Sequence, residues 1–441
     1  MKVLIISQMV FNKTNNMGKT LMSYFKGWNP SDVAQLYFHA FEPTDVSICE
    51  SYYRFSDVDA VKSVINRRIV GKRFDKKTIQ TQESGKRTDE GIARKAYVVG
   101  AKHHAWSVIA RDFAWQLSNW KNSSLVEWVK NFDPDIFFFA SGDCEFSYRI
   151  AYWLSVKTGK PLVTLCVDDY YIHNRNEGEL LGQFRYKHFI KTAEKTLKHS
   201  SLVLTICDSM KREYERRFGV ECRVLHTSAQ TKQLDFAKEP FRIAYFGNLG
   251  YGRNIQLASI GQAISRIKDS IIPETLDVYS GSISQDLISV LKTGEGIDFH
   301  GAITPSDVQA RMQECIAVIH TESFDRNEKE QVRFSVSTKI AESLMYGPCL
   351  IAYGPEGIAS IDYLKENNAA YVITKPEDLE SGLEEILTNS ELRAKIVQNA
   401  RALAARNHNA EVNPKKVREW LEEVVQEQRY VCGGEKRSDE V

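Results

Sequence analysis

The amino-acid sequence predicts a two-domain α/β protein in which each domain holds a parallel sheet. The chain of 441 residues is long for one hydrophobic core and suits two domains of roughly 200 residues each. Short apolar runs bounded by turn residues alternate with longer amphipathic stretches, which is the pattern of βα units that build a parallel sheet. The alternation occurs once on each side of a polar stretch at 227–240. The repetition indicates two doubly wound units.

The strand candidates are short apolar runs, and both halves of the chain contain them. Those of the first half are 2–7, 33–38, 136–140, 162–167, 202–207 and 223–226. Those of the second half are 242–246, 276–279, 297–300, 317–320, 349–352 and 370–373. Amphipathic stretches between them, such as 146–157, 254–268 and 305–313, are typical of helices that connect parallel strands.

The boundary between the domains is predicted at 231–240, where a polar stretch with a proline precedes a new apolar strand. We therefore expect an N-terminal domain at 1–230 and a C-terminal domain at 241–410. A last helix is expected at 411–431, with a break at Asn413-Pro414, and a disordered tail at 432–441.

Composition excludes several classes of protein. Apolar residues make up 43% and charged residues 26%, the balance of a globular chain, and no apolar run approaches the ~20 residues of a membrane helix. The first residues read as a strand because no signal-peptide core follows them. The eight cysteines form no CxxC pair, so we expect a reducing, cytoplasmic compartment. A net charge of +1 argues against a nucleic-acid partner.

One segment of the N-terminal domain departs from the βα pattern. From Lys62 to Lys102 the chain carries twelve Lys or Arg residues against four acids, and an aromatic amphipathic stretch at 106–120 follows. One interpretation is a solvated insertion at about 62–104. The other is that the 62–120 region binds an anionic membrane surface or a lipid-linked acceptor, since basic charge near Trp and Phe suits a membrane interface. The protein would then be peripheral on the inner membrane face.

The most informative stretch runs from 331 to 357 and reads as loop, helix, strand and loop. Ser337 and Thr338 are natural N-cap residues, and Gly347 followed by proline ends the helix. A helix N-terminus presents unpaired N–H groups, so one that opens with Ser-Thr-Lys suits a diphosphate, to which Lys339 adds a full charge. Glu342 lies one turn further along the same face, where its carboxylate can accept hydrogen bonds from ribose hydroxyls. The alternative is an ordinary capped helix with surface charges.

This stretch resembles the donor-binding motif of glycosyltransferase family 4 and its GT-B relatives. The matching residues are Ser337 to Glu342, an apolar turn, Gly347-Pro348 and a strand. The resemblance implies two Rossmann-like domains that face each other across a cleft. It also implies two carboxylates eight positions apart, which contact the donor sugar and the nucleotide ribose. Glu342 matches the second carboxylate, whereas Phe334 stands at the first.

A second match to the family opens the C-terminal domain at 241–254, as strand, glycine turn and helix. The resemblance assigns Gly247 to the close approach of the donor and Arg253 to its diphosphate. A glycine leaves room for the ligand, and an arginine can bind two phosphate oxygens as a fork. Asn248 stands where the family commonly has an arginine. Without the resemblance, these glycines indicate only a βα turn.

The loop after the first strand contains Gly18-Lys19-Thr20, which also ends a P-loop. The earlier glycine that a P-loop requires is absent, so the sequence does not predict an NTPase. In GT-B enzymes a glycine-containing loop after the first strand faces the donor, and the resemblance makes Gly18 the candidate.

Acidic residues follow two predicted strands of the N-terminal domain. Asp143 follows the strand at 136–140, and Asp168-Asp169 follow the strand at 162–167. Ligands bind at the carboxyl ends of parallel strands, so Asp168 or Asp169 is expected to orient an acceptor hydroxyl or act as the base. The family usually has His-Asp at this place. The alternative is a pair of turn or capping acids.

The sequence therefore predicts a hexosyltransferase-type enzyme that moves a sugar from a nucleotide-diphosphate-sugar to a hydroxyl. The resemblance implies retention of configuration, with the leaving diphosphate stabilised by Arg253, Lys339 and the helix N-terminus. Neither a cofactor nor an essential metal is expected. Enzymes of this kind commonly build bacterial surface polysaccharides or glycolipids. Two alternatives remain open, a sugar-nucleotide epimerase of the same fold and a non-catalytic sugar-nucleotide binding protein.

Overall fold

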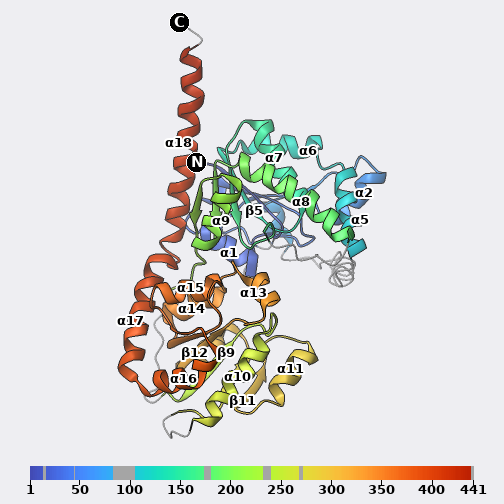
Figure 1. The fold of residues 1–441 in the computed structure, drawn as a ribbon. Coiled ribbons are helices and arrows are strands. Elements are labelled where there is room, and N and C mark those ends of the chain that lie inside the picture. Colours follow the sequence, from blue (N-terminus) through green and yellow to red (C-terminus); the bar gives the residue numbers. More distant parts are fainter. Residues whose placement is uncertain are drawn as a thin grey trace. The chain divides into compact units, whose positions relative to one another are not determined.

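The computed structural model describes residues 1–12, 16–43, 45–82, 105–172, 180–231, 240–267 and 272–438. The chain divides into two compact units (Figure 1). Unit 1 contains residues 1–205, 211–224 and 414–441, and unit 2 contains 206–210 and 225–413. The expected linker at 231–240 falls inside the range of unit 2, and its residues 232–239 lie outside the described part.

Unit 1 is built on an eight-stranded sheet of order β4-β3-β2-β1-β5-β6-β7-β8. Its neighbouring strands are parallel except for the antiparallel pair β3 and β4. The order reverses beside β1, because β2 pairs with one edge of β1 and β5 with the other. The strands are β1 Val3–Ser7, β2 Val33–Tyr37, β3 Ser51–Arg54, β4 Lys72–Asp75, β5 Ile136–Ser141, β6 Leu162–Cys166, β7 Leu202–Thr205 and β8 Cys222–Val224.

Helices connect these strands, and several start at the polar caps that sequence rules favour. Ser56 and Asp59 form a capping box at the start of α2, and the Asn122 side chain caps α6. The helices are α1 Asn16–Tyr24, α2 Asp57–Ile65, α3 Lys76–Gln82, α5 Ala105–Leu117, α6 Ser123–Phe132, α7 Glu145–Thr158, α8 Leu180–His199 and α9 Asp208–Phe218, with a 3-10 turn at Pro30–Asp32.

Unit 2 is built on a six-stranded parallel sheet of order β11-β10-β9-β12-β13-β14. Its strands are β9 Arg242–Phe246, β10 Leu276–Tyr279, β11 Ile297–Gly301, β12 Cys315–Thr321, β13 Cys349–Tyr353 and β14 Tyr371–Ile373. Its helices are α10 Arg253–Arg266, α11 Gln285–Lys292, α12 Pro305–Gln313, α13 Arg326–Val332, α14 Thr338–Tyr346, α15 Ala359–Glu366, α16 Leu379–Thr388 and α17 Ser390–Asn407, with a 3-10 turn at Pro376–Asp378.

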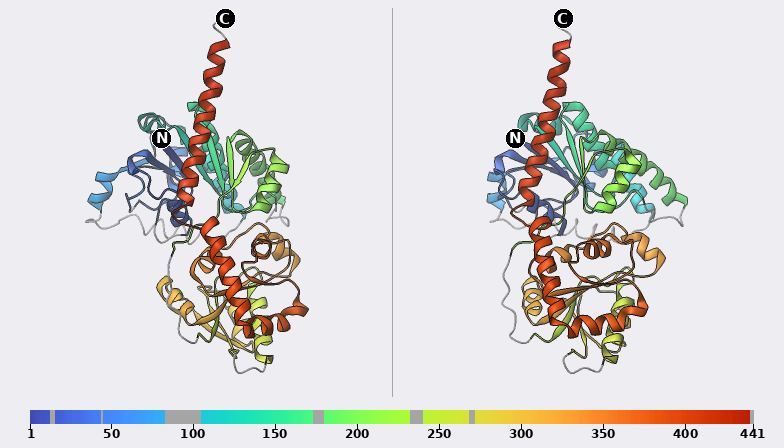
Figure 2. Two further views of the ribbon diagram at one scale, coloured as in Figure 1. Left: turned by 90° about the vertical axis from the view of Figure 1, so that its left-hand side faces the viewer. Right: turned by 60° about the vertical axis from the view of Figure 1, so that its left-hand side comes forward.

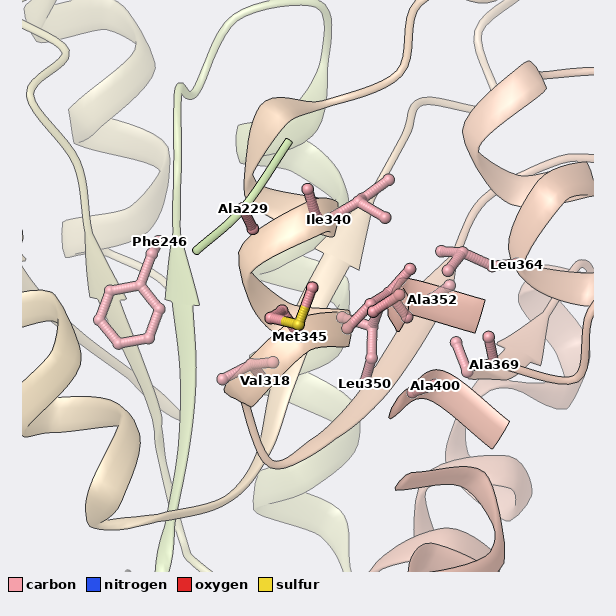
Figure 3. Close-up of a cluster of buried hydrophobic side chains, with 14 of the residues drawn as sticks. Ala229, Phe246, Val318, Ile340, Met345, Leu350, Ala352, Leu364, Ala369 and Ala400 are labelled. Atoms are coloured by element: carbon pink, nitrogen blue, oxygen red, sulfur yellow. The ribbon is translucent and has the colours of Figure 1, made fainter. Parts of the chain in front are cut away.

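Each face of the unit 2 sheet has its own hydrophobic core, because side chains alternate along every strand. Ile243 and Tyr245 of β9 belong to the core under α10, α11 and α16, whereas Ala244 and Phe246 belong to the core under α14, α15 and α17. Figure 3 shows part of the second core, with Ile340 and Met345 of α14 beside Val318, Leu350 and Ala352 of the sheet. Burying this face fixes the position of α14, the helix that the sequence singles out.

A long helix, α18 Asn413–Ser438, returns from unit 2 and packs on unit 1 (Figure 2). The Arg418 guanidinium lies 4.4 Å from the Trp28 ring centroid, and Gln428 donates to the carbonyl of Gly159 at 3.2 Å. The helix extends to Ser438, where the sequence analysis expects a tail from residue 432.

The predicted fold class is confirmed, and every strand candidate corresponds to an observed strand. The short strands β3 and β4 were missed. β4 lies inside the basic segment, so Lys72 to Asp75 belong to the sheet edge, while residues 83–104 of that segment lie outside the described residues. The cysteines among the described buried positions are all free thiols. Within the described ranges, no helix combines the length and apolarity needed to cross a bilayer.

Candidate functional site

The candidate donor site lies at the carboxyl edge of the unit 2 sheet. Loops leave this edge after β9, β10, β12 and β13. The N-termini of α10 and α14 lie at the same edge because each helix belongs to a crossover between parallel strands, α10 directly after β9 and α14 between α13 and β13. The predicted residues Gly247, Asn248 and Arg253 follow β9, while Ser337, Thr338, Lys339 and Glu342 belong to the start of α14. The topology therefore gathers both predicted motifs at one edge.

The central contact of this edge joins Arg253 to Glu322, the first residue after β12. Nε and Nη2 of Arg253 donate to the two carboxylate oxygens of Glu322 at 3.0 and 2.9 Å. The Glu322 side chain is 1% exposed and that of Arg253 14%, so the pair is almost completely shielded from water. The guanidinium fork that the sequence analysis assigns to phosphate is thus directed at a carboxylate of the protein.

Glu322 is not among the site residues predicted from the sequence. The residue follows the predicted strand at 317–320 almost directly, and the strand-end argument that selected Asp168 and Asp169 selects Glu322 as well. Its pairing with Arg253, 69 positions earlier, has no local sequence signal.

A buried histidine stands behind this pair. His320 Nε2 lies 3.0 Å from Ser360 Oγ and 3.6 Å from a Glu322 carboxylate oxygen. Burial and then the Arg253 charge lower the pKa of His320 to about 3, so the ring is neutral near pH 7. Burial raises the pKa of Glu322, against the opposite effect of Arg253. The site therefore contains one buried cation with one buried carboxylate.

The loop after β9 is shaped by close packing. A Cβ at Gly247 would lie 2.5 Å from the Tyr245 hydroxyl, which itself donates to the carbonyl of Asn248 at 2.6 Å. The Asn248 amide oxygen accepts from Gly250 N–H at 2.6 Å and so forms an Asx turn. The side chain that was predicted to contact the donor therefore bonds to its own loop. Gly252 caps α10 at φ +69°, and a Cβ there would lie 2.6 Å from Ser323 Oγ.

Helix α14 starts where the sequence predicts. Ser337 is the N-cap, and its hydroxyl accepts from Lys339 N–H at 3.3 Å, while Thr338 is the exposed first helical residue. Lys339 Nζ and Glu342 Oε2 lie 3.4 Å apart, so the two residues assigned to diphosphate and ribose form an ion pair with each other. Both side chains are partly exposed, which leaves them accessible to a ligand.

The C-terminus of α14 is held by an arginine from α17. Arg401 Nη1 donates to the Leu344 carbonyl at 2.7 Å and Nη2 to the Gly347 carbonyl at 2.5 Å. Gly347 is the C-cap, as predicted, but its φ of −71° is not left-handed. Glycine is needed there because a Cβ would lie 2.8 Å from the Ser343 carbonyl oxygen.

Phe334, which replaces the sugar-contacting carboxylate of the family motif, is buried beside α13. Its carbonyl accepts from the Cys207 thiol at 3.5 Å, and the Arg333 guanidinium lies 5.0 Å from its ring centroid. An apolar ring therefore occupies this position.

Gly18 and the acidic loops belong to unit 1. Gly18 lies in the first turn of α1, where a Cβ would be 2.7 Å from the Val10 carbonyl oxygen and 2.9 Å from Asn12 Cβ. The loop after β1 thus passes so close to α1 that only glycine fits. Asp143 follows β5, and its carbonyl accepts from Arg185 Nη2 at 3.3 Å.

The two consecutive acids after β6 have different surroundings. Asp169 is buried, and its Oδ1 accepts from the N–H groups of Tyr171 and Ile172 at 3.1 and 3.2 Å and from Tyr214 OH at 3.1 Å. Asp168 is less buried, and its Oδ1 accepts from Asp169 N–H at 2.9 Å. The contacts of Asp169 are those of a loop-forming acid, which makes Asp168 the better placed of the two for a substrate. Among the described residues, no group of three or more His, Cys, Asp or Glu side chains is placed to hold a metal ion.

Comparison with known proteins finds a matching domain family and similar folds. Residues 275–421 match the model of a family described as glycosyl transferase-like. The structure of Anabaena HepE in complex with UDP superposes with a TM-score of 0.62 at 14% identity, covering 96% of this chain and 100% of that one. Sucrose-phosphate synthase from Thermosynechococcus elongatus gives 0.59 at 10% identity over 96% and 99% of the two chains.

A third solved structure is WaaG, a glycosyltransferase involved in lipopolysaccharide biosynthesis, with a TM-score of 0.55 at 13% identity over 95% of this chain and 99% of that one. No curated protein sequence matches this chain. The chain has the GT-B fold and contains a glycosyl transferase-like domain. The predicted resemblance to GT-B glycosyltransferases is confirmed by the fold and by the matching domain, and the family 4 type stays a prediction.

Proposed function

We propose that this enzyme transfers a sugar from a UDP-sugar to a hydroxyl acceptor, with the donor held at the carboxyl edge of the unit 2 sheet. The observation that carries the proposal is the meeting, at this edge, of two helix N-termini with Arg253 and Lys339. Such an edge binds a diphosphate through unpaired N–H groups and cationic side chains. Uridine as the base is supported by HepE, whose solved complexes contain UDP and UDP-glucose.

The donor contacts follow from the side chains of α14 and α10. Lys339 binds the diphosphate when it leaves its ion pair with Glu342, and Glu342 then accepts from the ribose hydroxyls. Glu322 holds the guanidinium plane of Arg253, so that the remaining Nη1 nitrogen is the one left for a phosphate oxygen. Ser337, Thr338, Gly247 and Asn248 complete the predicted donor set.

Transfer releases UDP, whose growing negative charge is stabilised by Lys339, Arg253 and the α14 N-terminus. Retention of configuration is part of the proposal. In unit 1, Asp168 is proposed to orient the acceptor hydroxyl. The loop that contains Gly18 is proposed to face the bound donor. Asp169, the other predicted acid, has an indirect role, since its carboxylate holds the conformation of the loop after β6.

A role in surface polysaccharide or glycolipid synthesis is the proposed context, and the name of WaaG supports it by analogy of fold. The acceptor is then lipid-linked, and the protein acts at the inner membrane face. No metal is required in this mechanism, because cationic side chains and helix N-termini neutralise the diphosphate. Full activity in the presence of EDTA is the expected result, and activity restored only by added Mg²⁺ would overturn this part.

The test of the proposed function is calorimetric titration with UDP-glucose on the wild type and on Lys339→Ala and Glu342→Ala. Each substitution is expected to weaken binding by about 1 to 3 kcal/mol, the range of a lost charge-assisted contact. Lys198→Ala is the matched control, since Lys198 also forms an ion pair with a helix glutamate but lies on α8. Unchanged affinity in both α14 variants would refute the site.

Product analysis separates the transferase from its two alternatives. A glycoside with release of UDP identifies a transferase, a changed nucleotide sugar an epimerase, and unchanged donor a binding protein. The buried Phe334 in place of the sugar carboxylate is the observation that favours the binding protein.

A further inference from the structure

Unit 2 contains a pocket that is lined by α12 and by strands β9, β10 and β11. Its volume is about 480 Å³, within the range of about 300 to 1,000 Å³ that is usual for small-molecule sites. Of the described residues that line it, none belongs to the predicted donor set. We call it the α12 pocket, and its polar and aromatic side chains are Arg242, Tyr279, His300, Asp307, Arg311 and Glu314.

His300 reaches the α12 pocket at an irregularity of the sheet. The register of β10 and β11 shifts between Val278 and Tyr279, where His300 is the extra residue of a β-bulge. Tyr279 then pairs with Gly301, whose φ of +77° favours glycine. Bulges often re-aim a side chain beside a functional site. Here the imidazole stacks on the Tyr279 ring, with 4.6 Å between the centroids and an angle of 15° between the planes.

The polar groups of the α12 pocket include both donors and acceptors. His300 Nε2 lies 2.7 Å from the buried Asp277 carboxylate, so the neutral ring donates from this nitrogen and accepts at Nδ1. Arg311 binds Glu314 through Nη1 at 3.1 and 3.2 Å, which leaves Nε and Nη2 to donate elsewhere. Tyr279 is 7% exposed, and within the described part of the chain no group hydrogen-bonds to its hydroxyl. A nearly buried hydroxyl of this kind is rare, and one in a pocket wall indicates a ligand.

The charges around the α12 pocket compensate one another. Arg242 donates to Asp277 at 2.8 Å and lies 3.2 Å from Glu314. Glu314 is also the partner of Arg311, and Asp307 of α12 is a third acid. Two arginines therefore meet three acids, which leaves no surplus positive charge for a phosphate group. The recognised ligand should carry polar groups but no net charge.

We propose that the α12 pocket binds an uncharged oligosaccharide. Each sugar hydroxyl both donates and accepts, as the paired donors and acceptors of the wall require. The C–H groups on one face of a sugar ring can pack on the partly exposed imidazole of His300, while its hydroxyls bond to Tyr279 and Arg311. A nucleotide would suit the ring stack but not the charge balance. Because its wall contains no predicted donor residue, this pocket holds a saccharide rather than transferring one, which goes beyond the proposed function.

The experiment begins with an array of neutral oligosaccharides of glucose, galactose and N-acetylglucosamine, on which the labelled full chain is expected to bind. No nucleotide sugar is present, so turnover does not contribute. The strongest array ligand is then titrated calorimetrically into the variants. Tyr279→Phe and Arg311→Gln are each expected to raise its Kd about threefold to tenfold, the loss of one hydrogen bond. Arg266→Gln is the matched control, because Arg266 also pairs with a glutamate of unit 2 but lies on α10.

The outcomes separate this pocket from the donor site. Lys339→Ala should keep the affinity for the saccharide while it loses affinity for UDP-glucose. Wild-type protein that binds nothing on the array, or affinities of Tyr279→Phe and Arg311→Gln that equal the wild type, would overturn the proposal. So would binding of UMP or inorganic phosphate that weakens in these two variants, since the pocket would then take an anion. Urea denaturation should show unchanged stability for Tyr279→Phe, and a clear loss would mean that the hydroxyl bonds within the protein.

Discussion

Arg253 and Glu322 form a two-point ion pair at the carboxyl edge of the unit 2 sheet, with both hydrogen bonds between 2.9 and 3.0 Å. The pair joins the start of α10 to the end of β12, two elements that flank the loop after β9. A carboxylate this deeply buried stays charged only beside a cation, and the arginine in turn has lost most of its water. The geometry of the donor edge therefore depends on both residues being present.

Removing either member of this pair is expected to destabilise the protein strongly, because the other is left as a buried unpaired charge. Arg253→Ala and Glu322→Ala should each lower the free energy of unfolding by about 3 to 5 kcal/mol. The double variant should lose much less than the sum, and urea denaturation of the four proteins measures this coupling. Additive losses would show that the two groups do not depend on each other.

Acid stability is expected to depend on His320. Burial lowers its pKa to about 3 from an ordinary value of 6.5, so between these values the unfolded chain binds a proton that the folded protein excludes. Stability from this group is therefore complete above pH 6.5 and falls as the pH drops below it. The raised pKa of Glu322 acts in the opposite direction, since the folded state takes up that proton more readily.

The contribution of His320 is isolated by comparison with His320→Gln, which keeps a partner for Ser360 but does not titrate. From about pH 6 to pH 4 the wild type should lose stability relative to this variant by roughly 1.4 kcal/mol per pH unit at most. Urea denaturation at several pH values gives the difference. Parallel curves for the two proteins would mean that the imidazole binds its proton as readily in the folded state as in the unfolded chain.

Arg401 is expected to matter for the donor helix although it lies on α17. Arg401→Ala leaves the Leu344 and Gly347 carbonyls without their donor, which should cost about 1 to 3 kcal/mol of stability. Lysine should restore only part of this, because it lacks the planar fork that reaches both carbonyls. Lys395→Ala, an exposed change on the same helix, is the control in thermal and urea denaturation. Equal stability of Arg401→Ala and the control would contradict the capping role.

Substitutions of Asp168 and Asp169 should cause two different kinds of defect, one in activity and one in stability. Asp169→Ala removes the acceptor of two loop N–H groups and of Tyr214, so a loss of about 2 kcal/mol or more in unfolding free energy is expected. Asp168→Asn should keep near-native stability while kcat falls by about 10² or more, as expected for a group that orients or deprotonates the acceptor. Denaturation and steady-state kinetics on both variants decide this. Normal kcat in Asp168→Asn would remove that residue from the mechanism.

Most of the fold was predictable because local patterns encode it. The apolar runs at 242–246 and 276–279 became β9 and β10 with the same bounds, and the amphipathic stretch at 305–313 became α12 with the same bounds. The short strands β3 and β4 escaped prediction because each has only four residues, and β4, the edge strand, has a single buried phenylalanine among charged residues. A strand of this kind is specified by its neighbour more than by its own composition.

The candidate site was predictable in its backbone and less so in its contacts. Ser337 as N-cap and Gly347 as C-cap follow from local rules and stand where they were expected. The mutual pairing of Lys339 with Glu342 depends on the rotamers of two flexible side chains, which local rules do not specify. The outward direction of Ile65 on α2 is likewise visible only once that helix is packed.

By itself the sequence determined the order of twelve of the fourteen described strands, their division between two sheets and the place of α14, because each rests on the spacing of apolar and capping residues within a short stretch. Only the tertiary structure decided which groups neutralise one another. Arg253 meets Glu322 across 69 positions, and Asp169 meets Tyr214 across 45. Such contacts form when separate βα units lie side by side in one sheet. The energy of a buried charge or hydrogen bond depends on that proximity and on the exclusion of water. A local sequence pattern specifies neither of them.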